Sequence, residues 1–176
     1  MQDIPNEVRE YLVSSDGMVR QLLGQKHPDL KETLARPETR QAVLAWLASD
    51  EPWQEEHLGF TGNSLQYLIP AAAETEAAGI RPFLLHPHAL VRRRAHEYFV
   101  TLYFPDKNPP ALLATLQNML LDSDDGIRTA GMRFVKRGER LDEFRPFLRR
   151  WVRIAEQRGW QKSESLEIAT GLLKEQ

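Results

Sequence analysis

Apolar residues recur at three- and four-residue spacing along most of the chain, and this pattern predicts an all-helical protein. Alternating apolar and polar runs of the kind that form strands are nearly absent, and Gly and Pro separate the helical segments. The predicted helices span 6–13, 18–25, 29–35, a segment opened by Pro37, a segment opened by Ser64, then 87–104, 111–121, 126–137, 140–158 and a last one capped by Ser163.

The middle of the N-terminal half gives a less regular pattern. Residues 50–62 predict a longer loop or a distorted repeat. In the helix that follows, Pro70 is expected to lie in the first half or to introduce a kink, and Gly79 is expected to close it.

The segment LLHPHALVRRRAHEYFV at 84–100 recurs in altered form 36 residues later as LLDSDDGIRTAGMRFV at 120–135. A gap-free alignment pairs Val91 with Ile127 and Arg92 with Arg128, after a leucine pair and a short polar turn. Self-similarity at a fixed period predicts stacked helical hairpins. The step Val19-Arg20 lies 72 residues before Val91-Arg92 and suggests a further copy.

Two features of the copies predict how they pack. Ala95 and Gly131 are small residues at the same place, which predicts a close approach of the neighbouring helix. Arg92 and Arg128 stand just after the turns, so carboxylates at 122–125 are expected to cap the helix and to meet the arginine of a neighbouring repeat. In the first copy, residues 86–88 are His-Pro-His instead of an acidic turn. A series of Asp–Arg pairs between repeats would therefore lack its aspartate at this copy.

The leucine pair, the polar turn, the Val/Ile-Arg step and the small residue three places later resemble the HEAT-like repeat over about residues 84–137. The 36-residue spacing is shorter than the roughly 40 residues typical of that repeat. The resemblance implies an all-α, right-handed α-solenoid of stacked helical hairpins forming a single domain over 1–176. Within it, 1–80 would hold degenerate acidic repeats, 81–138 the best-formed repeats, and 139–176 the C-terminal capping helices.

Composition narrows the class further. The chain has 176 residues, 41% of them hydrophobic and 27% charged, and no cysteine, which is ordinary for one soluble domain and excludes disulfide and thiolate chemistry. No apolar run approaches the ~20 residues needed to cross a bilayer, and the opening stretch does not resemble a signal peptide, so we expect a cytoplasmic protein without membrane contact. Charge is polarised: 1–80 is acidic and 81–160 is basic.

Metal and catalytic sites are not expected. His86, His88 and His96 lack a carboxylate partner in register. HEAT-like iron hydroxylases bind metal through His-Glu pairs in successive repeats; His96-Glu97 fits, but the equivalent pair is Met132-Arg133, so we predict no metal and no cofactor. The triplet 55–57 (Glu-Glu-His) reads as either an acid–base group or a polar loop, and without a convergent constellation we predict no enzyme activity.

A repeat stack exposes a surface made mostly by its second helices, and the positions that differ between copies are candidates for binding a partner. Trp53 and Trp160 lie beside turns, where each is either an exposed hot spot or a partly buried cap. The predicted contact positions on the second helices are Arg93, His96, Glu97, Thr129, Met132, Arg133 and Lys136.

These observations predict a protein that binds another protein without catalysis. Small, charge-polarised single domains that lack catalytic motifs resemble bacterial immunity proteins, which implies a cognate toxin as the partner. Two alternatives stay open. The basic half favours nucleic-acid binding, and small HEAT-like DNA glycosylases of base repair are similar in expected fold. The third alternative is an adaptor or assembly factor for a larger enzyme.

Overall fold

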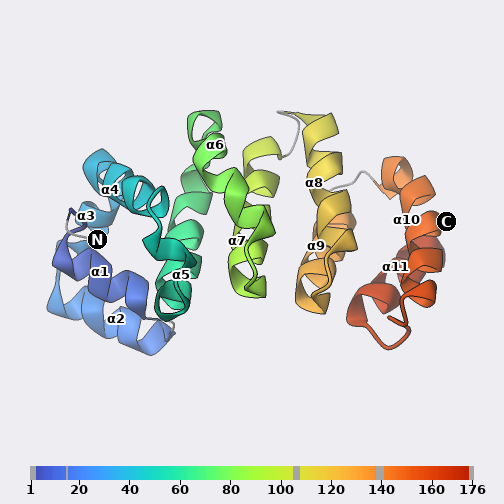
Figure 1. The fold of residues 1–176 in the computed structure, drawn as a ribbon, viewed down its shortest axis with the longest axis horizontal. Helices are drawn as coiled ribbons and strands as arrows, with labels where there is room; N and C mark the ends of the chain where they lie inside the picture. Colours follow the sequence, from blue (N-terminus) through green and yellow to red (C-terminus); the bar gives the residue numbers. More distant parts are fainter. Residues whose placement is uncertain (1–2, 15, 105–107, 138–140, 175–176) are drawn as a thin grey trace. The chain divides into compact units, whose positions relative to one another are not determined.

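The computed structural model describes residues 3–14, 16–104, 108–137 and 141–174, and the predicted all-α class is confirmed for them (Figure 1). These residues form eleven α-helices joined by short 3-10 turns and loops, and they contain no strand. No helix among them combines the length and apolar character that a membrane span requires. The expected start of a helix at Arg140 falls outside the described residues.

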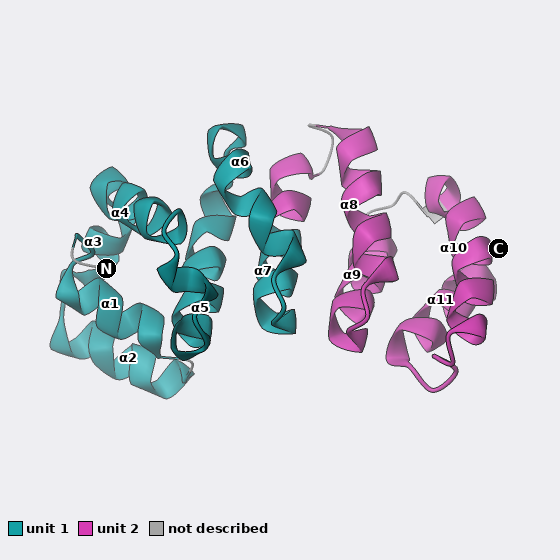
Figure 2. Ribbon diagram, viewed as in Figure 1, with its two compact units in different colours: residues 1–98 teal, residues 99–176 magenta. Residues whose placement is uncertain are grey.

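The chain divides into two compact units, 1–98 and 99–176, shown in separate colours in Figure 2. The division falls inside one continuous helix, α7 (Ala89–Tyr103), rather than after residue 80 or 138, where the sequence suggested changes of repeat type.

The first unit contains six complete helices and the first part of α7. Helix α1 has the predicted bounds, and Pro37 opens α4 at the first helical position, where its missing N–H costs nothing. Helices α1 and α4 both pack on α5, and their apolar faces supply the core of the unit. The helices are α1 (Asn6–Val13), α2 (Gly17–Lys26), α3 (Leu30–Ala35), α4 (Pro37–Leu47), α5 (Leu58–Leu68) and α6 (Ala77–Ile80).

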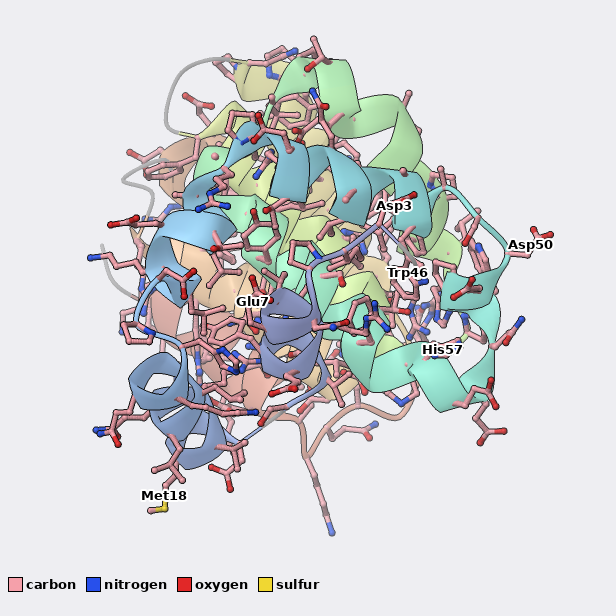
Figure 3. All side chains as sticks on the ribbon, turned by 90° about the vertical axis from the view of Figure 1, so that its left-hand side faces the viewer. Asp3, Glu7, Met18, Trp46, Asp50 and His57 are labelled. Atoms are coloured by element: carbon pink, nitrogen blue, oxygen red, sulfur yellow. The ribbon has the colours of Figure 1, made fainter. Side chains whose placement is uncertain are left out.

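The predicted loop at 50–62 is wrong in its second half, because α5 already begins at Leu58. Two short 3-10 turns (Glu51–Trp53 and Glu55–His57) lead into it, and the Thr61 hydroxyl donates to the carbonyl of His57 at 2.9 Å and to that of Pro52 at 3.1 Å. Figure 3 shows this end of the unit, with the ring of His57 at 6.1 Å from that of Trp46 in an edge contact. A buried hydroxyl thus fixes a turn that periodicity alone cannot show.

The expectations for Pro70 and Gly79 are also wrong. Helix α5 ends at Leu68, Pro70 lies in a 3-10 turn (Ile69–Ala71), and Gly79 lies inside α6. Proline cannot donate the backbone hydrogen bond that would continue the helix, so the chain leaves the helical path before it.

Side chains from three elements hold this irregular segment. The Arg40 guanidinium donates to both Glu76 carboxylate oxygens at 2.6 Å and to the carbonyl of Ala71 at 2.8 Å. The Tyr98 hydroxyl donates to Glu76 Oε2 at 2.8 Å and accepts the N–H of Ala73 at 3.0 Å. Burial alone raises the pKa of Glu76, but the hydrogen bonds from Arg40 and Tyr98 outweigh it and leave the pKa lowered.

The second unit is built from the end of α7 and four further helices. Helix α9 packs against both α8 and α11, and α11 packs against α10. At the α8–α9 contact, a Cβ added to Gly131 would lie 3.0 Å from Met119 Cβ, so the predicted close approach at this small residue is confirmed. The helices are α8 (Pro109–Leu121), α9 (Asp125–Arg137), α10 (Leu141–Gln157) and α11 (Glu164–Lys174).

Two local signals fix the link between α10 and α11. Gly159 adopts φ +75°, and the N–H of Trp160 reaches back to the carbonyl of Ala155 at 2.9 Å, which is a Schellman ending. The predicted cap at Ser163 is confirmed, since its Oγ accepts the N–H of Leu166 at 3.3 Å.

Turns at regular intervals are closed by the same hydrogen bond, in which a side-chain atom accepts the backbone N–H two residues later. The acceptors follow one another at intervals of 35, 37 and 36 residues, which matches the period found in the sequence. They are Ser14 Oγ, Ser49 Oγ, His86 Nδ1 and Asp122 Oδ1, at 3.3, 3.3, 3.0 and 2.8 Å from the N–H nitrogens of Asp16, Glu51, His88 and Asp124.

At three of these turns, an arginine six residues after the acceptor donates to the acceptor's own carbonyl. Arg20, Arg92 and Arg128 do so at 2.8, 2.9 and 2.8 Å. The suggested copy at Val19-Arg20 therefore shares its turn geometry with the two clear copies. The turn closed by Ser49 differs, because the residue six positions after the acceptor is Glu55 instead of an arginine.

The expectation that a turn carboxylate meets the arginine of a neighbouring repeat is wrong for Arg128. Its guanidinium bonds the carbonyls of Asp122 and Ser123 and the carboxylate of Asp125, all at the start of its own helix. Arg128 is the fourth residue of α9, so its side chain lies close to the carbonyls of the turn that precedes the helix, and its guanidinium is engaged there. In the first copy, the imidazole of His86 supplies the acceptor that the missing aspartate would have supplied.

Candidate interaction site

Three of the predicted contact residues are buried and cannot meet a partner in this conformation. His96 and Met132, which occupy the same repeat position, are 4% and 0% exposed, and Thr129 is buried as well. Helix α9 packs against both α8 and α11, so its buried arc is wider than one face. These positions belong to the scaffold, and their assignment to the outer surface was wrong.

Arg93 and Glu97 are both partly buried on α7 and pair with each other. Glu97 accepts from Arg93 Nε at 2.9 Å and from Arg94 Nη1 at 2.6 Å, four and three residues earlier on the same helix. The Arg93 side chain is 42% exposed, whereas that of Glu97 is largely covered. Such pairs stabilise a helix by a few tenths of a kcal/mol, and they leave Arg93 the more accessible of the two.

Trp53 is a flat aromatic surface beside the His86 turn. Its ring stacks on Phe83 at 5.3 Å with an interplanar angle of 12°, and on His86 at 4.9 Å. The side chain remains 42% exposed. Burial lowers the pKa of His86, and the nearby His88 lowers it further, so the imidazole under the tryptophan is neutral at physiological pH.

Trp160 is placed differently, because it packs on the repeat arginine of the second copy. The Arg128 guanidinium lies 3.8 Å from the Trp160 ring centroid, and the Trp151 ring lies 6.3 Å away. Arg128 itself is buried, so the contact is desolvated on the arginine side. This geometry gives Trp160 a role in holding the turn, with part of its surface exposed.

Arg133 and Lys136, the remaining predicted residues, lie together at the rim of a shallow groove between α9 and α11. Arg133 donates to Glu164 at 2.6 Å, and the two side chains are 57% and 53% exposed. The α11 side of the groove consists of Glu167, Ile168, Gly171 and Leu172.

Two contacts hold the groove in shape. Ser165 Oγ at the start of α11 donates to Asp125 Oδ1 at the start of α9 at 2.7 Å, which ties the two helices together at one end. Leu172 is buried between them further along. The cationic rim therefore stands on a rigid pair of helices rather than on a loop.

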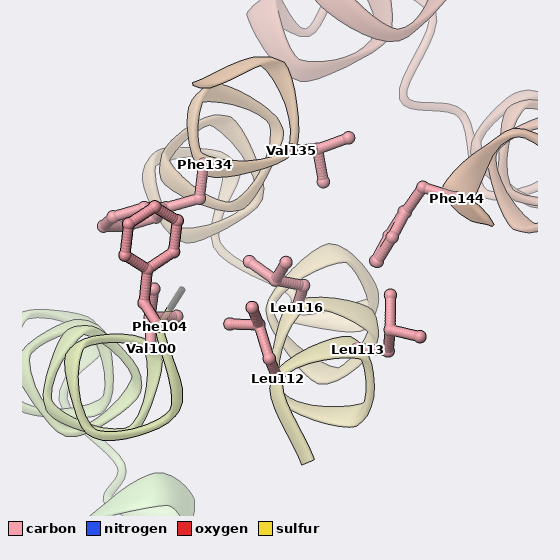
Figure 4. Close-up of a pocket in the computed structure, with 8 residues that line it drawn as sticks. All are labelled: Val100, Phe104, Leu112, Leu113, Leu116, Phe134, Val135 and Phe144. Atoms are coloured by element: carbon pink, nitrogen blue, oxygen red, sulfur yellow. The ribbon is translucent and has the colours of Figure 1, made fainter. Parts of the chain in front are cut away.

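An apolar pocket in the second unit was not predicted from the sequence (Figure 4). Phe104 lines it and is 43% exposed, and Phe134, which also lines it, is only partly buried. The other lining residues are Val100, Leu112, Leu113, Leu116, Val135 and Phe144. No polar side chain lines it, so the pocket itself offers no group for acid–base or metal chemistry.

Within the described residues, no group of three or more His, Asp or Glu side chains converges as a metal site would require. In the candidate acid–base triplet, His57 Nε2 lies 3.5 Å from Glu56 Oε1, and the Glu56 side chain is 76% exposed. Comparison of the chain with protein families, curated proteins and solved structures finds no match.

Proposed function

We propose that the chain is a HEAT-like, right-handed α-solenoid that binds another protein without catalysing a reaction. The observation that carries the proposal is the recurring turn, in which an arginine donates to its own turn's carbonyls at 12–20, 84–92 and 120–128. Regular turns of this kind support a stack of like hairpins, and such stacks serve chiefly as binding scaffolds.

The groove between α9 and α11 and the Trp53 surface supply the candidate contacts. Arginine and tryptophan are among the residues most enriched in binding hot spots, and Arg133 and Trp53 are both exposed here. Within the class of protein binders, we propose an immunity-type protein whose partner is a cognate toxin, acting in the cytoplasm. The support for this finer class is the small size, the polarised charge and the absence of a recognised catalytic motif in the sequence.

The alternative of nucleic-acid binding has one observation in its favour. Exposed arginines Arg149, Arg150 and Arg153 on α10 add positive charge to the second unit. Phosphate contacts from such residues would make binding strongly dependent on salt.

Affinity capture of the tagged chain from its native host tests the proposal. We expect one protein to co-elute in a stable ratio, with recovery unchanged by nuclease treatment. Recovery of nucleic acid alone, lost as salt is raised, would replace the proposal with the alternative.

A further inference from the structure

We infer that the groove between α9 and α11 binds an acidic, amphipathic segment of the partner protein. The groove is the surface formed by Arg133 and Lys136 on α9 and by Glu167, Ile168, Gly171 and Leu172 on α11. This inference rests on the proposed function and adds the chemistry of the partner segment to it.

The rim of the groove is cationic on the α9 side. Arg133 and Lys136 are three residues apart and therefore share one face of the helix, and Arg137, which is also exposed, follows Lys136. The pairing of Arg133 with Glu164 is solvent-exposed on both sides, so it contributes little to stability and a partner carboxylate can replace Glu164 at small cost.

The floor of the groove is apolar and open. Ile168 is partly exposed beside the buried Leu172, and a Cβ added to Gly171 would meet no atom within 4 Å. A glycine one helical turn from Glu167 leaves room for an apolar side chain from outside. A segment that fits must therefore carry carboxylates for the rim and at least one aliphatic or aromatic side chain for the floor.

The α11 side disfavours a nucleic-acid backbone in this groove. Glu164 and Glu167 are both exposed there and would repel a continuous row of phosphates. A peptide can place its carboxylates opposite Arg133 and Lys136 and leave the position opposite Glu167 apolar or basic. The mixture of charges on the groove thus favours a protein segment.

The test uses the full chain and three fluorescent probes: a synthetic peptide with Glu and Leu at helical spacing, the same peptide with each Glu replaced by Lys, and a single-stranded oligothymidine. Anisotropy titrations should show the Glu/Leu peptide binding most tightly. The double reversal Arg133→Glu/Lys136→Glu should weaken its binding by about tenfold or more, because it places like charges in contact. The matched control Arg149→Glu/Arg153→Glu changes net charge equally but alters α10 outside the groove, and it should change binding by less than about threefold.

A second variant fills the groove without changing its charge. Gly171→Trp builds on a Cβ position that meets no atom within 4 Å, so the thermal midpoint should be retained while peptide binding is lost. The inference is overturned if the Lys peptide or oligothymidine binds as tightly as the Glu/Leu peptide, if none of the probes binds, or if the α9 and α10 reversals weaken binding equally. Applying the same variants to the captured partner keeps the two proposals apart: a partner whose recovery ignores the α9 reversal overturns the groove alone, whereas the absence of any partner overturns the proposed function.

Discussion

His86 and Asp122 close equivalent turns with different chemistry. The Nδ1 atom of His86 accepts the N–H of His88 at 3.0 Å, and Oδ1 of Asp122 accepts the N–H of Asp124 at 2.8 Å. A carboxylate keeps this acceptor at any pH above its own titration, whereas an imidazole loses it once both ring nitrogens carry protons. The two copies should therefore respond differently to acid.

The His86 turn is expected to make stability depend on mildly acidic pH. Burial is the main cause that lowers the pKa of His86 in the folded chain, so the unfolded chain binds a proton first as pH falls through about 6.5. The free energy of unfolding should be constant above that value and decline below it. Urea denaturation of the wild type and His86→Asn at about pH 7.5 and about pH 5 measures this, since Asn keeps a neutral acceptor.

His88→Asn is the control for this prediction, because His88 is exposed, gives the turn its backbone N–H, and is only the second cause, after burial, of the lowered pKa of His86. It should keep most of the pH dependence that His86→Asn loses. An unchanged pH dependence in His86→Asn would show that another group is responsible.

Two glycine-to-alanine substitutions should act in opposite directions. Gly131→Ala places a methyl group 3.0 Å from Met119 Cβ and 3.2 Å from Leu120 Cδ2, and it should cost about 1–3 kcal/mol. Gly171→Ala meets no neighbour and should stabilise by about 0.5–1 kcal/mol, because alanine is the better helix former. Denaturant midpoints of the two variants measure this directly. Changes in stability of the same sign would contradict the packing found at Gly131.

The Arg40–Glu76 pair is expected to stabilise the first unit. Glu76→Gln leaves the mostly buried Arg40 without its carboxylate and should lower the free energy of unfolding by about 2–4 kcal/mol. Glu164→Gln at the exposed Arg133 pair is the control and should cost less than about 1 kcal/mol.

The same Glu76 variant has a pH signature. Because the pKa of Glu76 is lowered in the folded chain, its contribution is present above the ordinary value of 4.5 and is lost as pH falls below it. The stability difference between wild type and Glu76→Gln should therefore shrink in acid, and a difference that grows there would rule out the ion pair as its source.

Arg128 and Trp160 should be energetically coupled. A double-mutant cycle with Arg128→Lys and Trp160→Leu should give a coupling free energy of about 0.5–2 kcal/mol, because lysine lacks the planar group that stacks on the indole. Additive effects of the two substitutions would mean that the 3.8 Å stacking contributes nothing.

The sequence predicts the helices best where residue chemistry marks their ends. Pro37 and Ser163 fix two starts, and the structure places both as expected. The sequence-based prediction of helix bounds fails between residues 50 and 80. The start of α5 depends on the hydrogen bond from the Thr61 hydroxyl to the carbonyl of Pro52, which is nine residues away in sequence. Such a hydrogen bond cannot be inferred from the pattern of apolar and polar residues.

The candidate site was predicted only in part, for a similar reason. Arg133 and Lys136 were found because they differ from their counterparts in the other copy, and both are exposed. Met132 met the first condition but is buried, because α9 has neighbours on two sides. The groove itself depends on Gly171 and α11, which lie outside the repeated segment and gave no signal.

The arginines that bond to the carbonyls of their own turns have a consequence for how such a chain can change over time. A hairpin that satisfies its buried cation internally needs no matching acid from the next hairpin. At Arg128, substitutions in a neighbouring helix would therefore leave these partners of the guanidinium in place. The Arg40–Glu76 pair is the opposite case, because it joins two elements and a change at either position strands the other.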